Sequence, residues 1–286
     1  MRARRRFTLK LRTRTLELGE RTQVMGVLNV TPDSFSDGGR YLATRAAVRR
    51  ALEMEAEGAD IIDIGGESTR PGSEGVSMER ELERVLPVLN GLRGRLKIPI
   101  SIDTQKAAIA ASAIALGAEL VNDVSALRGD PLMGSLVRKT GVAVVLVHMR
   151  GRPKTMQRGP FARDVMRDVT RGLREALERA RRAGISRERV ILDPGIGFGK
   201  TAEQNCELLA RLPELARLGC PLLVGSSRKA FIGKLLGGAG EEQRMWGTAA
   251  TVTAAVLGGA QIVRVHDVKE MVQVVRVAQR IREAGK

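Results

Sequence analysis

Residues 98–123 read IPISIDTQKAAIAASAIALGAELVND. A short run rich in isoleucine ends at Asp103, and a second apolar run ends at Asn122 and Asp123. Short runs that are almost continuously apolar are typical of strands buried on both faces, as in a parallel sheet. The stretch between the two runs is long enough for the helix that connects parallel strands. The segment therefore predicts a strand–helix–strand unit with polar residues at the ends of both strands.

The same alternation recurs along the chain and predicts the fold class. Between the apolar runs lie stretches with helical spacing, as where Leu82, Val85 and Leu89 share one face. Eight such units match the size of a (β/α)8 TIM barrel. A doubly wound open sheet is the competing architecture, although no G-x-G-x-x-G turn follows the first run. The eight runs are Gln23–Asn29, Asp60–Gly65, Ile98–Asp103, Glu119–Asp123, Val142–His148, Arg189–Asp193, Pro221–Ser226 and Gln261–His266.

The two ends of the chain fit the same architecture. Phe7–Leu18 alternates loosely and predicts an N-terminal β-hairpin that closes the barrel floor. Val268–Ile281 predicts a last amphipathic helix. Since no internal repeat, low-complexity segment or linker interrupts the pattern, we expect residues 1–286 to form a single domain.

Composition excludes several classes of protein. The 286 residues are 43% hydrophobic and 28% charged, which argues against wholesale disorder. No apolar run reaches the roughly 18–20 residues of a membrane span, and the basic start MRARRRFTLK lacks the apolar region of a secretory signal. Cys206 and Cys220 are a poor basis for a disulfide framework. We therefore expect a cytoplasmic protein without a membrane partner.

The net charge of +16 leaves a nucleic-acid-binding protein as an alternative of a different class. Two features argue against it: the basic residues are spread over the helical stretches, and aromatic residues make up only 2% of the chain. A platform for stacking bases is hard to build from so few rings. We expect no nucleic-acid partner, and a basic surface is equally compatible with a small anionic substrate.

Rare polar residues gather at the predicted strand ends, which lie on one rim of a barrel, where the active site forms. A single Asp or Asn after a strand is usually a helix cap or a turn former, but seven on one rim indicate a binding site. For His148, a structural role and a contact with substrate both remain open. The seven residues are Asn29, Asp103, Asn122, Asp123, His148, Asp193 and His266.

These residue types suit a particular kind of ligand. Carboxylates and an amide, as in Asp103, Asn122 and Asp193, complement the edge of a 2-amino-4-oxo heterocycle such as guanine or a pterin. A second group with Arg264, His266 and Lys229 is able to hold an anion, since Arg makes forked contacts with phosphate. Asn29 offers an oxygen to a Mg²⁺ that also binds phosphate.

Four loops stand out by composition. The segments 30–39 and 65–75 are long and rich in glycine, which predicts mobile lids. The segment 193–200, DPGIGFGK, lacks the G-x-x-x-x-G-K-[ST] spacing of a phosphate-binding P-loop. The segment 225–229, GSSRK, offers backbone amides and two cations, which fit either an anion site or a basic surface turn.

Taken together, the motifs resemble those of the dihydropteroate synthases. They occur in the family's order from Val24 to Val268, and the first two are long and specific. The runs are VMGVLNVTPDSFSDGG, DIGGESTRPG, SIDT, NDV, LDPGIGFGK, GSSRK and RVHDV. The nearest rival is a pterin-binding methyltransferase with a corrinoid partner, which needs the pterin-binding residues but neither the diphosphate-binding residues nor the lids.

The resemblance implies a homodimeric transferase of folate biosynthesis. It would condense 6-hydroxymethyl-7,8-dihydropterin diphosphate with p-aminobenzoate, assisted by Mg²⁺, and release 7,8-dihydropteroate and pyrophosphate. The route would be dissociative, with the carbon–oxygen bond breaking first. Sulfonamides resemble the amine and would compete for its pocket.

The resemblance also implies roles for individual residues. Asp103, Asn122 and Asp193 would hold the pterin with Lys229 nearby, while Arg264 and His266, with Asn29 and Mg²⁺, would take the diphosphate. The catalytic set would be Asp103, Asp193, Lys229 and Arg264. Thr69 and Arg70 in one loop, and Asp33, Ser34 and Phe35 in the other, would cover the site. The p-aminobenzoate pocket would be shaped by Pro71, Phe198, Ser227 and Lys229.

Overall fold

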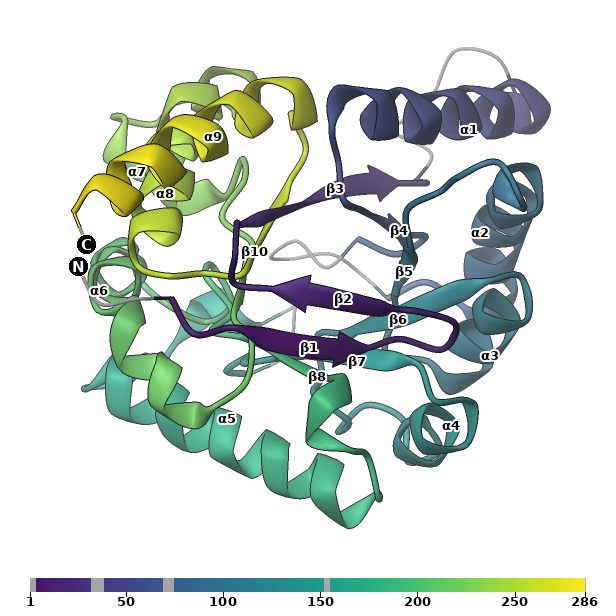
Figure 1. Ribbon diagram of the computed structural model, residues 1–286, viewed down its shortest axis with the longest axis horizontal. Helices are drawn as coiled ribbons and strands as arrows, with labels where there is room; N and C mark the ends of the chain where they lie inside the picture. Colours follow the sequence, from purple (N-terminus) through teal and green to yellow (C-terminus); the bar gives the residue numbers. More distant parts are fainter. Residues whose placement is uncertain (1–3, 32–38, 69–74, 152–154, 286) are drawn as a thin grey trace.

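Eight parallel strands form the centre of the protein (Figure 1). The computed structural model describes residues 4–31, 39–68, 75–151 and 155–285. The strands follow the order β8-β7-β6-β5-β4-β3-β10-β9, and a parallel bridge between Leu192 and Leu222 joins β9 to β8 and closes the ring. They are β3 (Gln23–Asn29), β4 (Ile61–Gly65), β5 (Ile100–Asp103), β6 (Ala118–Asp123), β7 (Ala143–Val147), β8 (Val190–Asp193), β9 (Leu223–Val224) and β10 (Ile262–Val265). The predicted (β/α)8 barrel is confirmed, and the open doubly wound sheet is excluded.

Helices surround the barrel and alternate with its strands (Figure 1). They are α1 (Gly39–Glu57), α2 (Met78–Leu92), α3 (Ala107–Ala115), α4 (Met133–Thr140), α5 (Val165–Arg182), α6 (Ala202–Ala210), α7 (Ala230–Leu235), α8 (Met245–Leu257) and α9 (Val268–Ala284). No helix in the described part of the chain is long and apolar enough to cross a membrane.

Helix α5 shows how the local sequence specifies these elements. Asp164 precedes the helix, and its Oδ1 accepts a hydrogen bond of 2.9 Å from the amide of Arg167, which caps the first turn. Val169, Leu173 and Ala176 recur every three or four residues and are buried against the barrel. The apolar stripe faces the barrel, and polar residues such as Asp168 and Arg179 add contacts to neighbouring segments.

Strand β9 is shorter than the predicted run 221–226. Pro221 has no amide hydrogen to donate to a neighbouring strand, although its carbonyl accepts from the Leu192 amide at 2.9 Å. At the other end, Ser226 Oγ lies 2.9 Å from Thr251 Oγ1 of α8. The chain therefore leaves the sheet soon after Val224 and enters the loop that leads to Lys229.

The predicted N-terminal hairpin closes the barrel floor. Strands β1 (Phe7–Lys10) and β2 (Thr15–Leu18) pair antiparallel and cross the end of the barrel (Figure 1). Leu9 and Leu18 are buried in the cluster that fills the barrel interior, together with Met25 and Ile61 from the strands. This plug seals the N-terminal end of the barrel, which leaves the C-terminal end for ligands.

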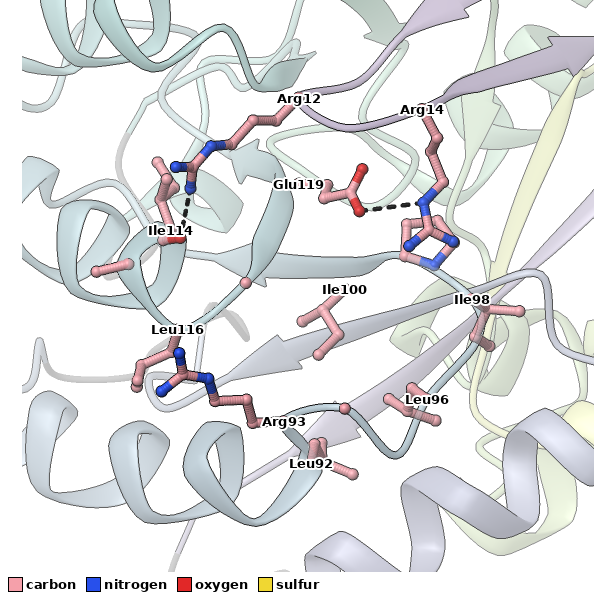
Figure 2. A pocket seen from close by; sticks show the side chains of 14 residues that line it. Arg12, Arg14, Leu92, Arg93, Leu96, Ile98, Ile100, Ile114, Leu116 and Glu119 are labelled. Atoms are coloured by element: carbon pink, nitrogen blue, oxygen red, sulfur yellow. Dashed lines mark hydrogen bonds and ion pairs between the residues drawn. The ribbon is translucent and has the colours of Figure 1, made fainter.

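A cavity of about 300 Å³ lies at this floor rather than at the opposite rim (Figure 2). Its rim includes Arg12, whose Nη1 donates to the Ile114 carbonyl at 3.0 Å, and Arg14, whose Nε donates to Glu119 Oε1 at 3.1 Å. The walls come from the N-terminal ends of β5 and β6. Asp103 lies at the C-terminal end of β5, whereas the cavity lies at the N-terminal end. The cavity is therefore separate from the predicted site.

Candidate active site

The strand register brings the predicted polar residues to one level of the barrel. Asn29 pairs with Gly65, Gly65 with Asp103, and Asp103 with Asn122, so adjacent strands β3 to β6 present them side by side. Asp193 ends β8, Arg264 lies in β10, and His266 follows that strand directly. All of these strand ends point to the same mouth, because every strand in the barrel is parallel.

Two glycines mark how closely these side chains approach one another. A Cβ at position 65 would lie 3.8 Å from both Asn29 Oδ1 and Asp103 Oδ2. A Cβ at position 225 would lie 3.8 Å from Arg264 Cδ and 3.9 Å from Asp193 Oδ2. The amide, both carboxylates and the guanidinium therefore surround one mouth, as the sequence predicted.

Arg264 joins two carboxylates across the mouth. Its Nε donates to Asp63 Oδ2 at 2.6 Å, and its Nη2 donates to Asp103 Oδ2 at 2.7 Å. Asn122 Nδ2 donates to the same Asp63 oxygen at 3.0 Å. Although burial opposes the charge, Asp63 and Asp103 hold the pKa of Arg264 above its usual value. The network keeps the guanidinium charged and oriented.

Asp63 is the residue that sequence reasoning missed. It lies within β4 between Ile62 and Ile64, is fully buried, and holds both Arg264 and Asn122 in place. The available signal was a carboxylate inside an otherwise apolar strand, because a buried charge needs a partner.

Several buried oxygens at the mouth have no partner in the described part of the chain. Asp103 Oδ1 and Asn122 Oδ1 are both shielded from solvent and accept no hydrogen bond there. Leaving a buried acceptor unpaired costs about 1–3 kcal/mol. A ligand that carries N–H groups along one edge would satisfy both oxygens, which matches the predicted heterocycle.

The loop after β8 forms the second wall. Asp193 Oδ1 accepts from the Gly195 amide at 2.6 Å, which fixes the carboxyl group. Lys229 Nζ lies 4.2 Å from the centre of the Phe198 ring and donates to the Ile196 carbonyl. A lysine and an aromatic ring in this arrangement form a cation–π contact beside the carboxylate.

Burial moves the pKa values of this site toward neutrality. Burial raises the pKa of Asp103 to about 7, although Arg264 opposes the shift. It also raises the pKa of Asp193 against the pull of Lys229. Burial lowers the pKa of Lys229 to about 8. Shifted groups of opposite charge in one mouth are typical of an active site.

The turn at residues 225–229 is tied to the end of β10. Ser227 Oγ lies 3.0 Å from His266 Nδ1 and accepts from the His266 amide at 3.2 Å. Arg228 has a φ of +58° and donates from Nε to Asp267 Oδ2 at 3.0 Å. Ser227 and His266 are therefore brought together, while the charge of Arg228 is paired with Asp267.

Two rim residues have local roles instead. Asp123 accepts from the amides of Ser125 and Leu127 at 2.8 and 2.7 Å, so it shapes a turn, as a single Asp after a strand usually does. His148 is buried, with Nδ1 3.1 Å from Lys200 Nζ, which favours the structural role of the two that the sequence left open.

Six predicted residues fall outside the part of the chain that the structure describes. They are Asp33, Ser34, Phe35, Thr69, Arg70 and Pro71.

Comparison with known proteins agrees with this geometry. Residues 25–266 match the model of the family described as pterin binding enzyme. The chain belongs to this family, and the relatives that it resembles include several dihydropteroate synthases. One, from Synechocystis, is 50% identical over 260 residues, which cover 91% of this chain and 90% of the relative.

Solved structures of dihydropteroate synthases share the fold. The structure from Yersinia pestis, in complex with a sulfonamide drug, superposes with a TM-score of 0.90 at 46% sequence identity. The match covers 97% of this chain and 100% of the Yersinia chain. That from Xanthomonas albilineans, with 4-aminobenzoic acid, also has a TM-score of 0.90, at 45% identity, with coverage of 97% and 98%.

Proposed function

We propose that this chain is a dihydropteroate synthase. It condenses 6-hydroxymethyl-7,8-dihydropterin diphosphate with p-aminobenzoate to give 7,8-dihydropteroate and pyrophosphate in folate biosynthesis. The observation that carries the proposal is the pair of unpaired buried oxygens on Asp103 and Asn122, next to the cations Arg264 and Lys229. A heterocycle that carries N–H groups and an anionic tail fits this combination. The similarity of the chain to known dihydropteroate synthases supports the particular substrates.

The pterin would lie against the oxygens of Asp103, Asn122 and Asp193. Ionised carboxylates accept from the ring N–H and amino groups, and the Asn122 amide oxygen accepts as well. Asn122 cannot rotate freely, because its Nδ2 is committed to Asp63. Its Oδ1 is therefore held as the acceptor, which favours the edge of a 2-amino-4-oxo ring.

The diphosphate would be held by Arg264, His266 and Lys229. Two guanidinium nitrogens of Arg264 are engaged by Asp63 and Asp103, whereas Nη1 makes no hydrogen bond within the described residues. That nitrogen is positioned to donate to a phosphate oxygen. Ser227 orients the His266 ring at the same end of β10.

A Mg²⁺ would bind at Asn29. No group of three His, Cys, Asp or Glu side chains in the described residues forms a metal cluster. Mg²⁺ needs none, since it keeps few protein ligands and shares the oxygens of a bound phosphate. The Asn29 amide oxygen beside Asp103 fits that requirement. When bound, the ion would supply positive charge to the leaving diphosphate.

The reaction exchanges one bond at the pterin methylene carbon. The carbon–oxygen bond to the diphosphate breaks, the aniline nitrogen forms a bond to the same carbon, and the amine proton passes to solvent or the leaving group. In the dissociative route, Asp103 and Asp193 stabilise the cation that spreads into the ring, while Arg264 stabilises the pyrophosphate. No strong protein base is needed, because a neutral aniline attacks a cation.

The p-aminobenzoate pocket would involve Phe198, Ser227 and Lys229. The ring of Phe198 lies against the Lys229 ammonium and offers an apolar surface to a second aromatic ring. Sulfonamides resemble the amine and would compete here. The roles predicted for Pro71, and for Asp33, Ser34, Phe35, Thr69 and Arg70 as cover of the site, stay predictions.

A coupled assay of pyrophosphate release tests the function. With both substrates and Mg²⁺ we expect release that a sulfonamide inhibits competitively with p-aminobenzoate. Omitting p-aminobenzoate should abolish turnover. Absence of release with both substrates would contradict the proposal, and methyl transfer from a methylated pterin would instead support the rival pterin-binding methyltransferase.

Three broader properties complete the proposal. Residues 1–286 would form one domain, which is supported by a continuous apolar core between barrel and helices. The protein would be a cytoplasmic homodimer. Free thiols at Cys206 and Cys220 support a reducing compartment, and exposed apolar side chains on α7 to α9, including Leu235 and Trp246, support self-association.

A further inference from the structure

Lys200 ends the glycine-rich loop 193–200 with its side chain turned into the protein. The residue is only 4% exposed. Its Nζ donates to the carbonyl oxygens of Gly195 at 2.8 Å and Phe198 at 3.0 Å. The same ammonium lies 3.1 Å from Nδ1 and 3.4 Å from the carbonyl oxygen of His148. A single buried ammonium thus joins His148 to two carbonyl groups within the loop that carries Asp193 and Phe198.

The loop has little stiffness of its own. Gly195, Gly197 and Gly199 all have positive φ, at +67°, +83° and +65°. A Cβ at Gly195 would lie 1.8 Å from the His148 carbonyl oxygen, so no other residue fits there. Glycine permits this close approach but leaves the unrestrained backbone many conformations. Contacts from side chains in and around the loop therefore help to define its shape, and Asn205 Oδ1, for example, accepts from the Gly197 amide at 2.6 Å.

His148 supplies one of those contacts as a neutral acceptor. Burial lowers the pKa of His148 well below its ordinary value, and the charge of Lys200 adds to the effect. With Nδ1 facing an ammonium, the hydrogen-bond network assigns the proton to Nε2, which lies 3.6 Å from Asp168 Oδ2. Asp168 is itself held by Arg150 and Arg171, at 3.2 and 2.8 Å.

The Lys200 charge also acts on the site electrostatically. Burial, together with Lys229, lowers the pKa of Lys200 to about 7. The charge of Lys200 in turn opposes the rise in the pKa of Asp193. A buried ammonium is costly unless it is hydrogen-bonded, and the loop carbonyls provide those bonds. The arrangement links the shape of the loop to the ionised state of Asp193.

We propose that Lys200, supported by His148 and Asp168, is a positioning residue that presents Asp193 and Phe198 to the substrates. The proposal rests on the roles that the proposed function gives to Asp193 and Phe198. It also accounts for His148, a rim residue for which the mechanism has no step. Lys200 itself touches neither substrate, because its ammonium is enclosed by the loop and by His148.

The main test compares Lys200→Met with Lys139→Met, which removes an exposed lysine on α4. We expect Lys200→Met to raise KM for p-aminobenzoate and to lower kcat, each by about tenfold to a hundredfold, because small displacements of reacting groups carry such penalties. Hydrogen exchange of the amides in residues 195–199 should become faster in Lys200→Met and stay unchanged in Lys139→Met.

A second pair of variants covers the case in which Lys200→Met does not fold. His148→Gln keeps an oxygen that accepts from the ammonium, whereas His148→Leu removes the acceptor. We expect His148→Leu to reproduce the kinetic and exchange effects and His148→Gln to restore most of them. Kinetic constants and exchange rates that match the wild type in both Lys200→Met and His148→Leu, with only the melting temperature lowered, would overturn the proposal.

The two proposals fail in different ways. A wild-type protein that releases no pyrophosphate contradicts the proposed function. The exchange measurement needs no substrate, so unchanged exchange at residues 195–199 in Lys200→Met contradicts the positioning role even in an active enzyme.

Discussion

Arg264 Nη2 donates a hydrogen bond of 2.7 Å to Asp103 Oδ2. The two residues lie on non-adjacent strands, β10 and β5, and meet across the mouth of the barrel. In the proposed reaction Asp103 faces the pterin and Arg264 faces the diphosphate. Their hydrogen bond means that Asp103, which would bind the pterin ring, and Arg264, which would bind the diphosphate, orient each other.

Asp63 should be required for activity although it is not placed against a substrate. Asp63→Asn removes the charge that holds both Arg264 and Asn122. Breaking one side of a buried ion pair costs about 3–5 kcal/mol, so we expect kcat/KM to fall by at least about a hundredfold. The control is Asp60→Asn, just before the N-terminal end of β4, where the carboxylate pairs with Arg21. This variant should leave the steady-state kinetics unchanged. Equal kinetics for both variants would show that Asp63 does not orient the site.

Asp193 should matter for turnover more than for folding. Asp193→Ala removes a carboxylate that would stabilise the cation, and we expect kcat/KM to fall by about a hundredfold or more. Burial raises the pKa of Asp193, so the ionised group is unfavourable in the folded protein at neutral pH. The isosteric Asp193→Asn should therefore melt at or above the wild-type temperature. Wild-type turnover in Asp193→Ala would remove the residue from the site.

The pH dependence of kcat/KM should be bell-shaped. As pH falls through about 7, Asp103 takes up a proton and loses its acceptor character and its charge. As pH rises through about 8, Lys229 loses its proton and its charge. Steady-state rates measured from about pH 5 to 10 should decline on both sides. Lys229→Arg should remove the part of the alkaline decline that Lys229 contributes, because a guanidinium does not titrate in this range. A profile without an acidic decline would contradict the role of Asp103.

Asn29 should set the requirement for Mg²⁺. Chelation of divalent ions should suppress pyrophosphate release, and added Mg²⁺ should restore it. Asn29→Leu removes the amide oxygen beside Asp103, so we expect half-maximal activity to need about tenfold more Mg²⁺. Asn90→Leu changes an exposed amide on α2 and provides the matched control. The same Mg²⁺ titration curve in both variants would argue against a metal at Asn29.

Self-association should involve the surface of α7 to α9. Trp246 is 77% exposed at the start of α8, and Leu235 and Leu236 at the end of α7 are also exposed. An apolar surface of this kind favours contact with a second copy. Trp246→Glu should shift sedimentation toward the monomer, whereas Leu132→Glu, beside α4, should not. A wild-type protein that sediments as a monomer would contradict the proposed homodimer.

Much of the fold and several site residues could be predicted from local sequence. Apolar runs such as 142–148 identify buried strands without knowledge of their neighbours, because a strand covered on both faces must be apolar throughout. The positions of Asp103, Asn122 and Asp193 at strand ends followed from the same pattern. Parallel strands then require these ends to meet at one rim.

The partners of those residues could not be read in the same way. Whether Asp123 caps a turn or faces the mouth depends on the path of residues 124–127. Whether His148 meets a substrate or Lys200 depends on how a glycine-rich loop packs against β7. The His148 contact joins residues that lie 52 positions apart in the sequence, whereas the Asp123 contacts are local and depend on the backbone conformation of that turn.

The sequence by itself determined the barrel, the hairpin at its floor and the chemistry of the rim, because periodicity and residue type are local properties. Only the tertiary structure revealed Asp63 as the shared anchor of Arg264 and Asn122, and Lys200 as the cation beneath the loop. Hydrogen bonding between strands 201 residues apart, as for Asp63 and Arg264, depends on closure of the ring, which no single segment encodes.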